Sequence, residues 1–265
     1  MPSVISKVEA GVATITLSRP SALNALDRAG MIELAQAAKA AATDPEVRVV
    51  VLTGEGRAFC AGGDVKAMLT GAMSLAGETP LQAAIGAAGD LHEAIETLSL
   101  MPKIVISAVN GVAAGGGVGI ALAADLVLAA KSATFKLGYT DIGLSPDGGS
   151  TWALTRLIGH RRALELFLTN RTLDAQEAAT IGLINRAIDN DQFESEVACL
   201  AAALANGPSR AFAETKQLVR QAQANDLPTQ LREEQAAIGR SAVTEDVMEG
   251  LMAKIQKRAP AFKGR

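Results

Sequence analysis

Short apolar segments that alternate with helix-forming sequence constrain the fold of this chain most strongly. Four segments have the length and composition of strands: "GVATITLS" (11–18), "VRVVVLTG" (47–54), "KIVISAVNG" (103–111) and "LVLAAK" (126–131). The first alternates, and the others are nearly continuous apolar runs, as in strands covered on both faces. Helical sequence such as residues 24–44 separates them. The alternation predicts an α/β fold with a parallel or mixed sheet.

The pattern changes near residue 190. From there the sequence is helical in periodicity almost throughout, with interruptions at Gly207-Pro208 and at Pro228. We therefore expect an α/β core over residues 1–190 and a helical C-terminal region over 191–265. Residues 71–90 are rich in Ala and Gly, and they predict a mobile loop that leads into a helix ending near Met101.

Composition excludes several classes of protein. A net charge of -3 with only 3% aromatic residues gives no basic stripe or stacking platform for nucleic acid. The chain's 2 His and 2 Cys residues show no ligand spacing, so we expect neither a metal site nor a disulfide framework. No apolar run approaches the roughly 18 residues of a membrane span, and the N-terminus lacks a signal-peptide pattern. These features predict a cytoplasmic protein.

Two glycine-rich stretches lie where a strand gives way to a helix. They are "FCAGGDV" (59–65) and "VNGVAAGGGVGIALAAD" (109–125). Backbone N–H groups at such turns have no partner within the helix and can bind an anion or a developing oxyanion. The simpler interpretation is that the glycines only form turns and Asp64 caps a helix. A dinucleotide-binding fingerprint is excluded because its third small residue would fall on Ile120 or Leu122.

The stretch "GLSPDGGSTW" (143–152) holds an acid at the entrance to a third helix. Asp147 lies between Pro146 and two glycines, and an apolar run follows. Its carboxylate could cap that helix, or it could act as an acid or base beside the two glycine turns. We expect Ile142, Leu144 and Trp152 to surround it with an apolar pocket, where a carboxylate is a stronger base.

The segments "RPSALNAL", "FCAGGDV", "VNGVAAGGGVGIALAAD" and "IGLSPDGGSTW", in this order and spacing, resemble the enoyl-CoA hydratase/isomerase (crotonase) family. The resemblance extends over nearly the whole chain. It implies a crotonase-like spiral of ββα units, with a helical C-terminal region that forms trimers, often paired into hexamers. It also implies an acyl-CoA thioester substrate and no separate cofactor, since coenzyme A is part of the substrate.

Site residues follow from the resemblance, position by position. In the family the oxyanion is held by backbone N–H groups, which match Gly63 and Gly116 here. The resemblance further implies a set of substrate-binding residues: Ala22, Leu23, Ala61, Gly62, Asp64, Gly115, Tyr139 and Pro146.

The chain departs from the family's hydratases at both catalytic acids. Typical hydratases carry one Glu two residues after the glycine triplet and another four residues after the Phe that matches Phe135. This chain has Gly119 and Tyr139 there. Asp147 remains, at the position where the family's enoyl-CoA isomerases carry a Glu and its epoxyphenylacetyl-CoA isomerases an Asp. We therefore expect a double-bond isomerase in which Asp147 is the acid/base.

Three alternatives stay open. The 4-chlorobenzoyl-CoA dehalogenases of the family use an Asp at the position of Asp147 as a nucleophile, with a His at a spacing that fits His92. With 6 Phe, 1 Tyr and 1 Trp, however, this chain has few residues for an aromatic cage. The other two are a hydratase with an atypical site and a non-catalytic acyl-CoA-binding homologue. The acyl group and the pathway, fatty-acid or aromatic degradation, are not specified by the sequence.

Overall fold

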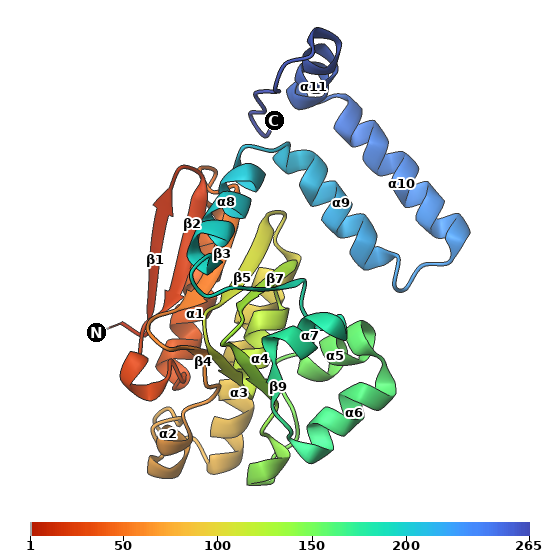
Figure 1. Cartoon of the computed structure of the whole chain (residues 1–265). Helices are drawn as coiled ribbons and strands as arrows, with labels where there is room; N and C mark the ends of the chain where they lie inside the picture. Colours follow the sequence, from red (N-terminus) through yellow and green to blue (C-terminus); the bar gives the residue numbers. More distant parts are fainter. Residues whose placement is uncertain (1) are drawn as a thin grey trace.

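The computed structural model describes residues 2–265, and a large mixed sheet runs through its core (Figure 1). In spatial order its strands are β1 (Val4–Glu9), β2 (Val12–Leu17), β3 (Val49–Gly54), β5 (Ile104–Val109), β7 (Leu126–Ala130) and β10 (Arg186–Ile188). The first two strands form an antiparallel hairpin, and every later pairing is parallel. The expected strands thus form the centre of this sheet.

A second, smaller sheet is made of very short strands. Its order is β4 (Ala58–Cys60), β6 (Val112–Ala114), β8 (Thr134–Lys136) and β9 (Leu173–Asp174). Three times in succession a strand of the large sheet is followed by a strand of the small one: β3 by β4, β5 by β6 and β7 by β8. A helix follows each pair, so the chain advances as a spiral of ββα units. The expectation of a crotonase-like fold is confirmed.

Helices fill the space between and around the sheets. They are α1 (Arg28–Thr43), α2 (Val65–Thr70), α3 (Pro80–Leu100), α4 (Gly116–Leu122), α5 (Ser150–Ile158), α6 (His160–Thr169), α7 (Ala175–Thr180), α8 (Phe193–Ala205), α9 (Ser209–Gln221), α10 (Leu227–Ala242) and α11 (Glu245–Gln256). The main core lies where α1 and α3 meet one face of the large sheet and the small sheet closes one end. In residues 2–265 no helix has both the length and the apolar character needed to cross a membrane.

The helical C-terminal region has two parts. Helix α8 packs on the second face of the large sheet, where Phe193, Val197 and Ala201 join a separate buried cluster. Helices α9, α10 and α11 instead project away from the core (Figure 1). The α/β core therefore includes α8. Buried polar contacts attach α9 to it, notably the ion pair between Lys216 and Asp125 at 2.8 Å.

Helix α3 begins earlier than the sequence analysis expected. A capping box at Thr79, completed by Gln82, starts the helix at Pro80. The connection between α2 and α3 is therefore limited to residues 71–79, and the expectation of a loop over 71–90 is wrong for its second half. Arg28 holds the start of α3 in place through ion pairs with Glu78 and Asp90.

Candidate active site

Two motif asparagines fix the turn from which the first glycine stretch departs. The Asn24 side chain, fully buried, donates to the carbonyls of Ala58 at 2.7 Å and Glu55 at 2.9 Å. The Asn110 side chain accepts from Gly54 N–H and donates to Gly56 O. The buried Asn24 amide defines one geometry, because an unpaired partner there would cost about 1–3 kcal/mol, and the half-buried Asn110 adds two bonds to the same turn. The connection between β3 and β4 is therefore rigid.

The first glycine turn runs beside the chain segment that carries "SALNAL". Gly62 has a φ of 90°, a left-handed value that glycine adopts without strain. Leu26 pairs with Gly63 in an isolated parallel bridge, donating to Gly62 O at 2.8 Å and accepting from Asp64 N at 2.9 Å. These two hydrogen bonds engage the Gly62 carbonyl and the Asp64 N–H, which flank the Gly63 N–H along the backbone. Within residues 2–265 that N–H has no hydrogen-bond acceptor.

The second glycine turn opens α4. Gly115 is the N-cap, with φ 50°, and Gly116 is the first helical residue. Within residues 2–265 nothing accepts a hydrogen bond from the Gly116 N–H, as is usual for the first turn of a helix. A Cβ on Gly62 would lie 3.1 Å from Gly116 N, so the two glycine turns are in contact. The fold thus brings the N–H groups of Gly63 and Gly116 into one neighbourhood.

Asp147 reaches the same place from the third stretch. It does not cap α5: the N-cap there is Gly149, and no side chain caps the helix. Instead, Oδ1 of Asp147 accepts a hydrogen bond of 2.7 Å from the Tyr139 hydroxyl. A Cβ on Gly116 would lie 3.9 Å from that same Oδ1. One carboxylate therefore lies beside the two glycine turns, free of any capping role.

Tyr139 is buried next to this carboxylate. Burial, and after it the negative charge of Asp147, raises the pKa of the Tyr139 phenol well above its usual value. The phenol therefore stays protonated and acts as a donor. A hydrogen bond to a charged group is among the stronger ones in proteins, so it holds the Asp147 carboxylate in one orientation.

Helix α3 supplies the apolar wall of the site. A Cβ on Gly116 would lie 3.2 Å from the Leu91 side chain, and one on Gly148 would lie 3.4 Å from the Ile95 side chain. His92, between them in sequence, accepts a hydrogen bond of 3.2 Å from Gly148 N–H through Nε2. Sequence reasoning did not identify Leu91 and Ile95, although their spacing of four residues on one helix face was visible.

The expected apolar pocket of Ile142, Leu144 and Trp152 is not formed. These side chains are 53%, 48% and 51% exposed. Instead, the Arg156 guanidinium lies over the Trp152 ring, with its Cζ 4.3 Å from the ring centroid. Residues 140–142 form a 3-10 turn that directs this segment to the surface, so the apolar contacts near Asp147 come from α3.

Backbone fills the space where a hydratase glutamate would start. A Cβ on Gly119 would lie 2.2 Å from the Gly148 carbonyl oxygen, far inside van der Waals contact. The second hydratase position is Tyr139, whose hydroxyl is bonded to Asp147. A side chain at position 119 is thus incompatible with this conformation of the 147–149 turn, and position 139 carries a phenol in place of a carboxylate.

The remaining residues of the expected site lie around the same turns. Ala22, Leu23, Ala61 and Pro146 are half-buried, and Leu23 O accepts from Ala61 N at 2.9 Å. Asp64 caps α2 by accepting from Ala67 N, as the simpler interpretation proposed. Cys60 is a core residue, and burial raises the pKa of its thiol to about 12.

A groove of about 820 Å³ lies elsewhere, between α8 and the large sheet. Residues from β2, β3, β5 and α8 line it, and none of the expected site residues does. No group of three or more His, Cys, Asp or Glu residues within 2–265 is arranged to hold a metal ion. The three turns, which hold Gly63, Gly116 and Asp147, remain the candidate active site, and the groove is separate from them.

A spiral of ββα units with two glycine N–H groups beside an acid is the arrangement that the resemblance to the enoyl-CoA hydratase/isomerase family implies. The profile of the enoyl-CoA hydratase/isomerase family matches residues 7–265. The chain belongs to this family.

Relatives within the family carry names for different reactions. A Rhodobacter capsulatus protein named probable enoyl-CoA hydratase is 41% identical, covering 98% of this chain and 97% of its own. The 1,2-epoxyphenylacetyl-CoA isomerase of Escherichia coli is 38% identical over the full length of both. An Arthrobacter 4-chlorobenzoyl coenzyme A dehalogenase-2 is 38% identical over 75% of this chain and 71% of its own. An enoyl-CoA hydratase structure from Bacillus anthracis, 34% identical, superimposes with a TM-score of 0.91 over 99% of this chain and 100% of that one.

Proposed function

We propose that this enzyme shifts a double bond in an acyl-CoA thioester, from Δ3 to Δ2 or within a ring-type acyl group, with Asp147 as the acid/base. The ionised carboxylate removes a proton from C2 of the 3-enoyl thioester. The electrons of that C–H bond delocalise into a dienolate, whose negative charge resides mainly on the thioester oxygen. The protonated Asp147 then delivers the same proton to C4, which gives the conjugated 2-enoyl thioester.

Gly63 and Gly116 supply the groups that stabilise the dienolate. Their backbone N–H groups have no acceptor within residues 2–265 and belong to two turns in contact with each other. Donors fixed in advance at a developing oxyanion are worth about 10²–10³-fold in rate each, and positioned proton transfer about 10²–10⁴-fold. A single carboxylate with this pair of donors is sufficient for the proposed shift.

One observation carries the proposal: Oδ1 of Asp147 lies beside Gly116 and is held by the Tyr139 hydroxyl at 2.7 Å. Hydration needs two acids to deliver and protonate a water molecule. Gly119 and Tyr139 occupy the hydratase positions, and the Gly148 backbone fills the space above Gly119. The arrangement therefore supports isomerisation over hydration.

The test compares the wild type with Asp147→Asn on a 3-enoyl-CoA, following the absorbance of the conjugated product. We expect Asp147→Asn to lower kcat by about 10²–10⁴-fold, because an amide cannot take up or return the proton. Asp141→Asn is the matched control, since this neighbouring acid is exposed and pairs with Lys136. Turnover of the 3-enoyl-CoA that survives Asp147→Asn would contradict the assignment. Tight binding of acyl-CoA without any turnover would instead indicate a non-catalytic binding protein.

Dehalogenation of an aryl-CoA is the second candidate, favoured by one contact. His92 Nε2 lies 3.2 Å from Gly148 N, which places an imidazole next to the residue that follows Asp147. Against it, Trp152 is half exposed, and the Tyr139 hydroxyl engages Oδ1 of Asp147, which leaves only Oδ2 of the carboxylate without this bond. Release of chloride from 4-chlorobenzoyl-CoA, abolished by His92→Gln and by Asp147→Asn, would favour this function over isomerisation.

The assembly we propose is a homotrimer or a hexamer of two trimers, in the cytoplasm, with no cofactor besides the coenzyme A of the substrate. Apolar side chains on the projecting helices support it: Val219, Leu227, Leu231, Ile238, Val243 and Ile255 are each more than half exposed. Faces of this kind usually mark protein contacts. Light scattering coupled to gel filtration tests the stoichiometry, and a monomeric mass at micromolar concentration would contradict it.

A further inference from the structure

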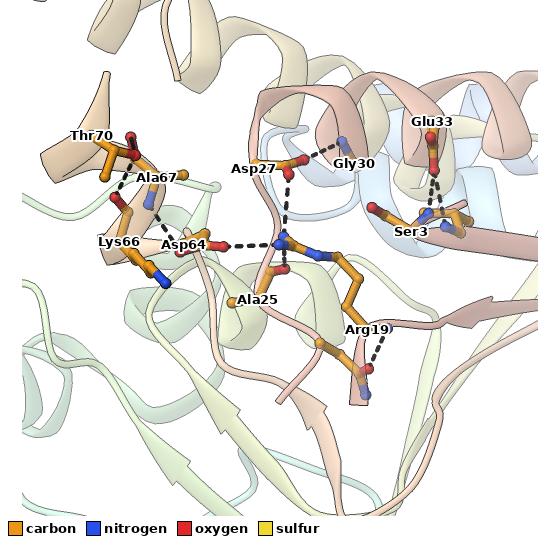
Figure 2. A network of polar contacts seen from close by, with 12 residues as sticks. Ser3, Arg19, Ala25, Asp27, Gly30, Glu33, Asp64, Lys66, Ala67 and Thr70 are labelled. Carbon is orange, nitrogen blue, oxygen red and sulfur yellow. Dashed lines mark hydrogen bonds and ion pairs between the residues drawn. The ribbon is translucent and has the colours of Figure 1, made fainter. Parts of the chain in front are cut away.

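The Arg19 guanidinium contacts Ala25, Asp27 and Asp64, the last of which belongs to the first glycine turn (Figure 2). The guanidinium donates to Ala25 O at 2.7 Å and to Asp64 Oδ2 at 3.0 Å, and it lies 3.4 Å from Asp27 Oδ2. The side chain of Arg19 is 26% exposed and that of Asp64 only 15%, so this is a partly buried cluster. Solvent therefore screens these charges less than it would at the surface.

Both acids of this cluster are helix N-caps. Asp27 accepts from Gly30 N at 2.9 Å at the start of α1, and Asp64 accepts from Ala67 N at 3.0 Å at the start of α2 (Figure 2). One arginine therefore links the two helix starts on either side of the backbone bridge between Leu26 and Gly63. Capping alone does not require it, because an aspartate caps a helix without a cation.

The position of Asp64 gives the Arg19 guanidinium a second role, besides linking the two helix starts. Asp64 directly follows Gly63, whose N–H faces the developing oxyanion in the proposed reaction. An unpaired carboxylate one residue away would repel the negative charge of the enolate. Burial tends to raise the pKa of Asp64, but hydrogen bonds from Ala67 N–H and Arg19 outweigh it and hold that pKa below its usual value. Asp64 is thus ionised, and Arg19 is the cation paired with it.

We propose that Arg19 is a positioning residue of the oxyanion site: by pairing with Asp64 it cancels a carboxylate charge beside Gly63 and keeps the 61–64 turn against the Leu23–Leu26 segment. It does not contact the reacting atoms. This inference rests on the proposed role of Gly63 in binding the enolate oxygen.

The test uses acetoacetyl-CoA, a β-keto thioester that ionises to an enolate with its own near-ultraviolet absorbance. The fraction ionised when bound measures oxyanion stabilisation without any turnover. We expect Arg19→Gln to lower the bound enolate-to-ketone ratio about tenfold, while the Kd of a saturated acyl-CoA changes less than twofold. Arg162→Gln, at an exposed position of α6, is the matched control for loss of an arginine charge.

Three further variants separate the effect of charge from that of side-chain shape. Asp64→Asn keeps the helix cap, since Asn caps as well as Asp, and removes the carboxylate charge. We expect Asp64→Asn to raise the enolate ratio above wild type, and Arg19→Gln/Asp64→Asn to recover most of what Arg19→Gln loses. Arg19→Lys keeps the charge and should lose less than Arg19→Gln. If Arg19→Gln proves unstable to heating, Asp64→Asn and Arg19→Lys still decide the question.

The outcomes distinguish this inference from the proposed function. A wild type that shows no enolate with acetoacetyl-CoA overturns the oxyanion site itself and this inference with it. A strong wild-type signal that Arg19→Gln leaves unchanged overturns only the role of Arg19. A double variant no better than Arg19→Gln also overturns it. A large loss of acyl-CoA affinity without change in the enolate ratio would instead make Arg19 a substrate-binding residue.

Discussion

Tyr139 donates its phenolic hydrogen to Oδ1 of Asp147 across 2.7 Å, and this bond spans the position that a second acid takes in the family's hydratases. Tyr139, a residue expected to bind substrate, thus contacts the proposed acid/base. The same bond explains how a carboxylate in a glycine-rich turn, with Gly148 and Gly149 after it, keeps one orientation.

Replacement of Tyr139 by Phe tests that orientation. The variant keeps the buried ring and removes only the hydroxyl, whose bond to a charged group is worth about 1.5–3 kcal/mol. We expect kcat on a 3-enoyl-CoA to fall about 10- to 100-fold with little change in KM. Tyr139→Phe combined with Asp147→Asn should cost no more than Asp147→Asn alone, because the two residues act as one unit. Unchanged kcat in Tyr139→Phe would show that Asp147 is oriented by other groups.

The close contact at Gly119 predicts a large effect from a single methyl group. Gly119→Ala would place a Cβ 2.2 Å from Gly148 O, so the 147–149 turn has to move. We expect a loss of about 1–3 kcal/mol in urea unfolding and at least a tenfold loss of isomerase rate. Gly89→Ala on α3 is the control, because a Cβ there meets nothing within 4 Å. That change should stabilise the protein by about 0.5–1 kcal/mol.

The two cysteines should differ in reactivity. Burial raises the pKa of Cys60 to about 12, so its thiol is protonated at pH 8, whereas Cys199 is exposed. Since the thiolate is the reactive form, iodoacetamide at pH 8 should label Cys199 alone in the native protein and both residues in urea. Peptide mass spectrometry reads the result. Equal labelling rates in the native state would mean that the core around Cys60 opens readily.

Acid should release the C-terminal tail from α11. Glu249 accepts hydrogen bonds from Arg258 and from Ala261 N–H, which lower its pKa to about 2 from an ordinary 4.5. A lowered folded-state pKa stabilises the contact above pH 4.5, and this stabilisation is lost as pH falls from about 4.5 towards 2. Hydrogen exchange of residues 258–261, corrected for the intrinsic pH dependence of exchange, should show the loss, since Asp246 and not Glu249 holds Lys263 and Gly264. Glu249→Gln should remove this pH dependence, and a wild-type profile flat down to pH 2 would contradict it.

The central strands and glycine turns were predictable because their signals are local. β3, β5 and β7 are continuous apolar runs, and each glycine turn directly follows a strand. The strands of the small sheet contain only two or three residues, too few for a visible period, and tertiary pairing alone defines them. The start of α3 was a missed local signal, since Thr79 and Gln82 have the spacing of a capping box.

The site was predictable in its parts but not in its contacts. Asp147 was singled out by its place between Pro146 and two glycines, and Gly63 and Gly116 followed from the family resemblance, whereas the meeting of the three residues depends on the ββα spiral. The bonds of His92 to Gly148 and of Arg19 to Asp64 join distant segments, and nothing local specifies them. The prediction of an apolar pocket made by Ile142, Leu144 and Trp152 was wrong, because these side chains are close to Asp147 in sequence but turn to the surface in the fold.

The contact between Gly119 and Gly148 also bears on how chemistries diverge within one fold. A glutamate at position 119 does not fit this conformation, because the first atom of its side chain would lie 2.2 Å from the Gly148 carbonyl oxygen. The turn that presents Asp147 would have to be rebuilt at the same time, and Tyr139 exchanged for an acid. Restoration of the Gly119-position glutamate therefore requires a shift of the 147–149 turn as well as a change of side chain. Laboratory selection for hydration should therefore first return variants with a remodelled 145–149 segment, before any that carry the glutamates.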